Sequence, residues 1–158
     1  MKADTNTMGD APANDAKAPH LAVLPGHLIR RAQQVHNEMW ARIVSGSISS
    51  VQYAVLSTVT RYEPVDQATV ARLVVLDKAS THAVAHRLKS AGYLEMTRSI
   101  VDGRRHELKL TEDGRRLCRE LEPRVESLRR ALNERLPSDD SRVLFDLLAA
   151  FINTPIAE

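Results

Sequence analysis

The chain has 158 residues, a mass of 17.6 kDa and a formal net charge of +2, a length sufficient for one domain with its own hydrophobic core. Its single cysteine excludes an internal disulfide framework and a cysteine-rich zinc site. Because it has no apolar run of about 18 residues and no apolar leader in residues 1–20, we expect a cytoplasmic protein with no membrane partner.

Basic side chains are concentrated in the middle of the chain. Residues 67–116 carry ten Lys or Arg against six Asp or Glu, whereas residues 1–66 are balanced and residues 117–158 are net acidic. A local basic excess favours a polyanionic partner, although a solvated surface gives the same count.

The first part of the chain predicts a tail followed by a long helix. Residues 1–19 are rich in Ala, Asp, Asn, Thr and Pro, so we expect a disordered tail, with a single domain over residues 20–158. An apolar stripe at helical spacing predicts an amphipathic helix over residues 26–46. The stripe consists of Leu28, Ala32, Val35, Met39 and Ile43.

A capping box marks the start of the second helix. Ser49 is followed three residues later by Gln52, so each side chain can bond to the backbone N–H of the other residue. Apolar residues continue the helical pattern up to Pro64, where the helix is expected to end.

Two aspartates predict a pair of short helices after this point. Asp66 is placed to cap a helix over residues 67–76, and Asp77 to cap a helix over residues 78–91 that Gly92 ends. Two short helices joined by a tight turn are typical of a helix-turn-helix.

The second of these helices has one apolar and one polar face. Its expected buried stripe comprises Thr81, Val84, Ala85, Leu88 and Ala91. The side chains expected to face outward are Lys78, Ser80, His82, His86 and Lys89, with Arg87 at the edge.

The next stretch predicts a two-stranded β-wing. Residues 93–99 alternate as a first strand, and Asp102-Gly103 is typical of a type I′ turn, in which both central residues need positive φ. On the return strand Leu108 and Leu110 alternate with polar residues, so one face is apolar.

Two further helices complete the predicted elements. Thr111 and the two acids after it begin a long helix, and Pro123 within that helix predicts a kink. Ser138 is expected to cap the last helix, whose apolar residues are too numerous for an exposed face, so the terminal helices need a partner surface. These residues are Val143, Leu144, Leu147, Leu148 and Phe151.

Three motifs carry a family resemblance that extends from about residue 26 to residue 153. They are Asp102-Gly-Arg104 followed by Leu110-Thr-x-x-Gly114, Arg87-Leu88 with Gly92-Tyr93-Leu94, and Ser50-Val-Gln-Tyr53 with Leu56. In this order of elements the chain resembles the multiple-antibiotic-resistance regulator (MarR) family of bacterial transcription factors.

The resemblance implies a mostly α fold with a small β-wing. A winged helix-turn-helix would occupy about residues 50–113, and dimerisation helices about residues 26–46 and 112–153. It also implies a homodimer that binds a palindromic operator in double-stranded DNA, without a cofactor. The resulting hypothesis is a repressor that a small-molecule effector releases from the operator.

The same resemblance suggests DNA contacts from the wing and from the helix over residues 78–91. Arg104 resembles the family arginine that enters the minor groove, with Asp102 bracing it, while Arg105 could touch phosphate or only water. The expected major-groove side is formed by Lys78, Ser80, His82, His86 and Arg87.

A ligand crevice is suggested near the first two helices. Trp40 and His36 on the first helix and Tyr53 on the second lie where family ligands bind, although Trp40 could simply fill the core. Arg30 and Arg31 could supply the cation for a carboxylate. This combination favours an aromatic carboxylate, or its thioester, as the effector.

Other functions remain as alternatives. His82 and His86 could hold a metal, but no nearby Cys or acidic cluster completes a site, and no Gly-rich phosphate loop, nucleophile elbow or metal-spaced His/Glu motif indicates an enzyme. A winged-helix interaction module without DNA binding would show a neutral or acidic recognition face. A redox-sensing regulator would need a reactive thiol, whereas Cys118 is expected to be packed and unreactive.

Overall fold

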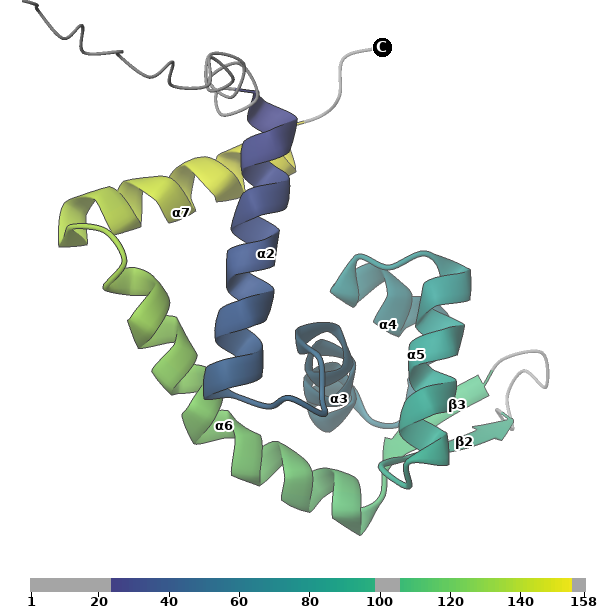
Figure 1. Cartoon of the computed structure of the whole chain (residues 1–158). Coiled ribbons are helices and arrows are strands. Elements are labelled where there is room, and N and C mark those ends of the chain that lie inside the picture. Colours follow the sequence, from purple (N-terminus) through teal and green to yellow (C-terminus); the bar gives the residue numbers. More distant parts are fainter. Residues whose placement is uncertain (1–23, 99–105, 155–158) are drawn as a thin grey trace, which may run out of the picture. The chain divides into compact units, whose positions relative to one another are not determined.

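The structure, a computed structural model, describes residues 24–98 and 106–154, and the chain divides into two units at residues 1–36 and 37–158. The helices and strands are shown in Figure 1. In chain order they are α2 (Pro25–Ile43), α3 (Ser50–Tyr62), β1 (Val65–Asp66), α4 (Gln67–Val74), α5 (Lys78–Ser90), β2 (Leu94–Arg98), β3 (His106–Leu110), α6 (Glu112–Asn133) and α7 (Ser138–Asn153).

The predicted fold class is confirmed: the described chain is mostly helical with one small antiparallel sheet. The sheet has the strand order β1-β3-β2, so it contains a third strand that the sequence analysis missed. Strand β1 is only two residues long, and it pairs Val65 with Leu108 and Asp66 with Glu107. Among the described residues, no helix combines the length and the apolar character needed to cross a bilayer.

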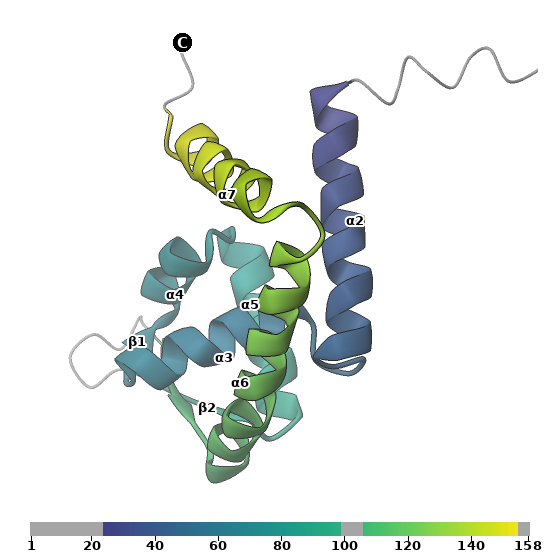
Figure 2. The same ribbon diagram turned by 90° about the vertical axis from the view of Figure 1, so that its left-hand side faces the viewer.

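Helix α3 is the centre of the winged part of the molecule. It packs against α4, α5, β3 and α6, and Figure 2 shows it running through the middle of these elements. Burial of apolar side chains from all of them drives their association. The core that results consists of Val55, Leu56, Val59, Val65, Val70, Ala85, Leu88, Leu94, Leu108 and Leu110.

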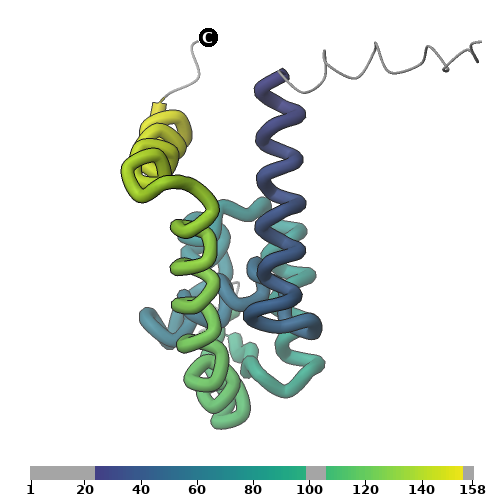
Figure 3. The backbone as a smooth tube through the Cα atoms, turned by 60° about the vertical axis from the view of Figure 1, so that its left-hand side comes forward, coloured from purple at the N-terminus to yellow at the C-terminus, as the bar shows by residue number. Residues whose placement is uncertain are grey.

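A second apolar cluster lies between the end of α2 and α6. It contains Trp40, Val44 and Ile48 on one side and Leu121 and Leu128 on the other. Figure 3 traces α6 as one continuous helix that leads through a short turn into α7. The helix therefore spans both clusters, because Leu117 packs against each of them.

Several predicted boundaries need correction. The helix predicted over residues 67–76 ends at Val74, because Val75 adopts a left-handed conformation with φ 56°. Ala91, predicted in the buried stripe, is exposed because it follows the last residue of α5. Ser138 is not a cap: Pro137 occupies that position without a side-chain hydrogen bond, and Ser138 is the first helical residue.

Candidate nucleic-acid interface and ligand groove

Two aspartate caps set the geometry of the α4–α5 pair. Asp66 accepts hydrogen bonds from the backbone N–H groups of Ala68 and Thr69, each at 3.0 Å. Asp77 accepts from the Ser80 N–H at 2.8 Å and from the Ser80 hydroxyl at 2.7 Å, and these bonds lower the pKa of Asp77. Both predicted caps are confirmed, and each satisfies backbone N–H groups that have no partner within the helix.

Helix α5 has an apolar inner face and a polar outer face, as predicted. Thr81, Ala85 and Leu88 are buried. The exposed side chains on the helix are Lys78, Ala79, His82, Ala83, His86, Arg87, Lys89 and Ser90. Of the predicted major-groove residues, only Ser80 is half-buried, because its hydroxyl is engaged in the cap.

The two α5 histidines are neighbours on the outer face. Their ring centroids lie 6.2 Å apart, and the His86 Nδ1 atom is 3.5 Å from the Ser90 hydroxyl. Within residues 24–98 and 106–154, no three His, Cys, Asp or Glu side chains gather as metal ligands would. Both side chains are exposed, so the pair belongs to the polar outer face of α5.

Strands β2 and β3 form the two sides of the wing. Their antiparallel register pairs Leu94 with Leu110 and Arg98 with His106. Leu108 and Leu110 are buried while Lys109 is exposed, so the predicted alternation is confirmed. The predicted turn and its residues Asp102, Arg104 and Arg105 lie outside the described residues.

A close backbone contact joins the wing to α6. The Thr111 hydroxyl caps α6 by accepting from the Gly114 N–H at 3.0 Å and donates to the Gly92 carbonyl at 2.7 Å. A side chain on Gly114 would collide with the Tyr93 carbonyl oxygen. The glycine of the Leu110-Thr-x-x-Gly114 motif is therefore required by the approach of α6 to the start of β2.

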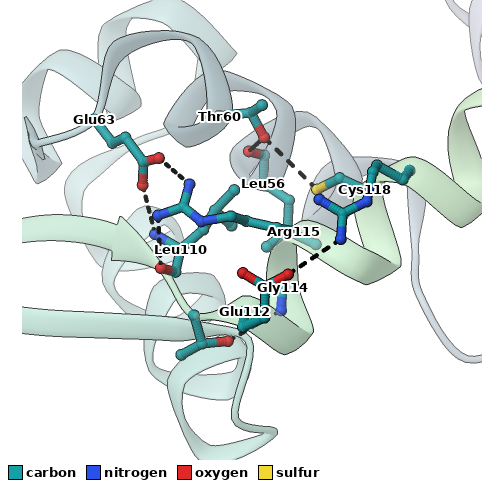
Figure 4. Close-up of polar contacts among 10 residues, drawn as sticks. Leu56, Thr60, Glu63, Leu110, Glu112, Gly114, Arg115 and Cys118 are labelled. Carbon is teal, nitrogen blue, oxygen red and sulfur yellow. Dashed lines mark hydrogen bonds and ion pairs between the residues drawn. The ribbon is translucent and has the colours of Figure 1, made fainter.

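An ion pair missed by the sequence analysis lies beside this corner (Figure 4). The Arg115 guanidinium contacts the Glu63 carboxylate and also donates to the Leu110 carbonyl at 3.2 Å, while Glu63 accepts from the Leu110 N–H at 2.9 Å. Burial raises the pKa of Glu63, but the hydrogen bonds from Arg115 and Leu110 outweigh it, so this pKa lies below its ordinary value. The sequence offered one signal for this ion pair: Glu63 lies at the C-terminal end of the second predicted helix, where a negative charge is unfavourable unless a cation lies nearby.

Trp40 and Tyr53, both predicted ligand residues, lie together. Trp40 is buried, its indole N–H donates to the Ile48 carbonyl at 2.6 Å, and its ring centroid is 5.6 Å from that of Tyr53. Tyr53 also lines an open groove of about 630 Å³ between α3 and α6. The other lining residues are Ser57, Glu122, Pro123, Val125 and Glu126.

The remaining predicted ligand residues belong to the unit formed by residues 1–36. Arg30 and Arg31 are exposed on α2, and His36 is half-buried. The structure does not place this unit relative to the groove, so these three assignments remain predictions.

Cys118 is half-buried on α6, where its sulfur accepts a hydrogen bond from the Thr60 hydroxyl at 3.7 Å. Burial raises the pKa of Cys118 above its ordinary value, and the bond from Thr60 opposes this only in part. Because the thiolate is the reactive form, this environment disfavours the redox-sensing alternative.

Comparison with known proteins gives consistent matches. A family model described as MarR family matches residues 47–105. The PcaV transcriptional regulator from Streptomyces coelicolor, solved with its natural ligand, is 38% identical, with 85% of this chain and 95% of that chain covered and a TM-score of 0.79.

Two further matches are more distant. BpsR from Bordetella bronchiseptica, whose DNA binding is regulated by 6-hydroxynicotinic acid, is 26% identical over 86% of this chain and 98% of its own, with a TM-score of 0.79. The HTH-type transcriptional repressor NicR from Pseudomonas putida is 27% identical over 90 residues, which is 56% of this chain. The matched stretch spans only 57% of the length of NicR.

Proposed function

The chain belongs to the MarR family of transcriptional regulators, and we propose that it is a homodimeric repressor that binds a palindromic operator and is released from it by a small-molecule effector. In this proposal residues 50–113 read DNA, while residues 26–46 and 112–153 form the dimer. The name of NicR as a repressor supports the direction of regulation.

The observation that carries the DNA-binding part is the outer face of α5. Lys78, His82, His86 and Arg87 are exposed on a helix whose inner face is anchored in the core. Cationic groups neutralise phosphates, and imidazole groups can bond to base edges in a major groove. An interaction module that had lost DNA binding has no need for this cationic surface.

The wing would supply the second contact. We assign Arg104 to the minor groove, with Asp102 bracing it and Arg105 on a phosphate. Replacing Arg104 by alanine should weaken operator binding by about 1 to 3 kcal/mol, the usual range for a specific contact.

The test is a fluorescence anisotropy titration with DNA taken from upstream of the protein's own gene. We expect binding that falls steeply with salt, a palindromic footprint, and half-site centres about 10 bp apart. A scrambled duplex is the control for non-specific binding. Equal affinity for both duplexes, or no binding at low salt, would favour the interaction-module alternative.

The effector site is proposed at the groove between α3 and α6, where Tyr53 is the aromatic lining residue and the buried Trp40 ring lies 5.6 Å from the Tyr53 ring. Glu122 and Glu126 line this groove, so an anionic ligand needs cations from outside it. From the family resemblance, and not from the geometry of the groove, we propose Arg30 or Arg31 as the cation for a carboxylate and His36 as a further polar contact. An aromatic carboxylate or its thioester fits this combination, and the regulation of BpsR by an aromatic acid supports the class.

Release from DNA would follow from a change in the dimer. A ligand that binds better to a dimer whose recognition helices are wrongly spaced shifts the population away from the DNA-binding form. The extent of release is limited by the difference between the ligand's affinities for the two forms.

A further inference from the structure

The edge of the sheet ends abruptly where β1 stops. The pairs Val65 with Leu108 and Asp66 with Glu107 would place Glu63 opposite Leu110 if the strand continued backward. Pro64 has no backbone N–H, so the ladder cannot continue through it. The N–H and C=O groups of Leu110 that face this edge therefore need partners other than β1.

Two side chains provide these partners. Glu63 accepts from the Leu110 N–H at 2.9 Å, Arg115 donates to the Leu110 carbonyl at 3.2 Å, and the two side chains contact each other. Figure 4 shows both side chains beside the backbone of Leu110. We refer to Glu63 and Arg115 with the Leu110 peptide as the Leu110 clamp.

The clamp joins three elements that serve different parts of the proposed function. Glu63 ends α3, Leu110 ends the return strand of the wing, and Arg115 lies in the first turns of α6. Leu110 and Arg115 are only five residues apart, whereas Glu63 and Arg115 are 52 residues apart in sequence. The contacts of Glu63 with Arg115 and Leu110 therefore hold the end of β3 against the end of α3.

The exposure of the pair argues against a purely stabilising role. The side chains are 39% exposed for Arg115 and 21% for Glu63, and partly exposed pairs contribute little to global stability. Each carboxylate oxygen nevertheless has its own partner, which restricts the orientation of the strand end.

We propose that the Leu110 clamp is a positioning device for DNA recognition. It holds β3 at a fixed angle to α3 and α6, so that the wing reaches the DNA while α5 lies in the major groove. Glu63 and Arg115 touch no DNA and act only through β3. This inference rests on the proposed operator binding.

The test compares Glu63→Gln and Arg115→Gln with a matched control, Arg116→Gln. Arg116 lies next to Arg115 and pairs at 2.6 Å with Asp113 on the same helix, without reaching the sheet. We expect both clamp variants to lose operator affinity about tenfold while the melting temperature falls by no more than a few degrees, and the control to keep its affinity. Arg115→Lys keeps the charge but cannot bridge both partners, so it should also lose affinity.

A double-mutant cycle with Arg104→Ala separates positioning from general destabilisation. If the clamp acts through the wing, adding Glu63→Gln to Arg104→Ala should cost little further affinity, because the wing contribution is already lost. Full affinity in the clamp variants, or losses that simply add to that of Arg104→Ala, would overturn the inference.

Amide hydrogen exchange provides a readout that does not depend on DNA. Exchange at Leu110 and along residues 106–110 should accelerate in both clamp variants and not in Arg116→Gln. If the wild-type protein fails to bind operator DNA, the proposed function fails while this measurement still judges the clamp. Unchanged exchange in the clamp variants would overturn the clamp itself.

Discussion

Gly114 lies at the third position of α6, directly beside the carbonyl oxygen of Tyr93. We expect Gly114→Ala to lower the free energy of unfolding by about 1 to 3 kcal/mol, because the added methyl group must push the helix away from the wing. Urea denaturation measures the change. Gly46→Ala is the matched control, since a methyl group at Gly46 meets no atom within 4 Å. An equal effect of both substitutions would contradict the steric explanation.

At Gly114 a glycine is required, whereas at Val75 a β-branched residue adopts a backbone conformation that favours glycine. Its φ is 56°, a left-handed conformation that is strained for valine. The residue is 86% exposed, so burial of its side chain does little to offset this strain. Val75→Gly should raise the free energy of unfolding by about 0.5 to 1 kcal/mol, after allowing for the greater freedom of glycine in the unfolded chain. A lower urea midpoint would show that the valine side chain has a stabilising contact.

These two positions also mark the limit of sequence reasoning for single residues. The sequence places Gly114 in a motif, but the reason why only glycine fits there is the Tyr93 carbonyl oxygen beside it, which only the structure shows. Val75 is neither glycine nor asparagine, the usual signals for a helix end, so the sequence pattern predicts a helix two residues longer than α4.

At the level of elements, most helix caps, which form within a few residues, were predictable, although Ser138 is not a cap, whereas the pairing of β1 across the chain was not predictable. The caps at Ser49, Asp66, Asp77 and Thr111 each bond to a backbone N–H within three residues, so their patterns are local. Strand β1 depends on pairing with β3, and two residues carry no periodic pattern. The Leu110 clamp was missed for the same reason.

The clamp should also make stability depend on pH. The pKa of Glu63 is lower in the folded chain, so its contribution to the free energy of unfolding is complete above the unfolded value of about 4.3 and is lost as pH falls through the folded value. Glu63→Gln should therefore destabilise by up to about 1 kcal/mol at pH 7 and by less at about pH 3. Urea denaturation at both pH values measures this, and a difference that does not shrink in acid would refute it.

For the whole molecule, α7 presents apolar side chains without burial. Val143, Leu147 and Phe151 are 50%, 63% and 69% exposed at spacings of one helical turn. We expect this face to be covered in a homodimer, so Leu147→Lys should shift the mass measured by light scattering at micromolar concentration toward the monomer. Ala149→Lys places the same charge on the opposite side of α7 and is the control. A monomeric wild-type protein would contradict the dimer.

Effector binding also concerns the whole molecule, because the effector is proposed to change the spacing of the recognition helices in the dimer. Calorimetric titration with aromatic acids, beginning with 6-hydroxynicotinic acid, should detect a ligand whose affinity falls about tenfold in Arg30→Ala or Arg31→Ala, consistent with loss of a charge-assisted contact. Arg42→Ala, on the same helix, is the control for general loss of positive charge. If the operator complex survives saturation with a compound that binds, the release mechanism is wrong.

The buried position of Trp40 has an optical consequence. It is the only tryptophan in the chain, and its indole ring is shielded from water while Tyr53 lies 5.6 Å away. Light absorbed by Tyr53 can pass to Trp40, so the emission of one fluorophore reports on a residue that lines the groove. The unlabelled protein therefore carries its own sensor, because loss of the second apolar cluster would expose Trp40 and shift its emission toward that of indole in water.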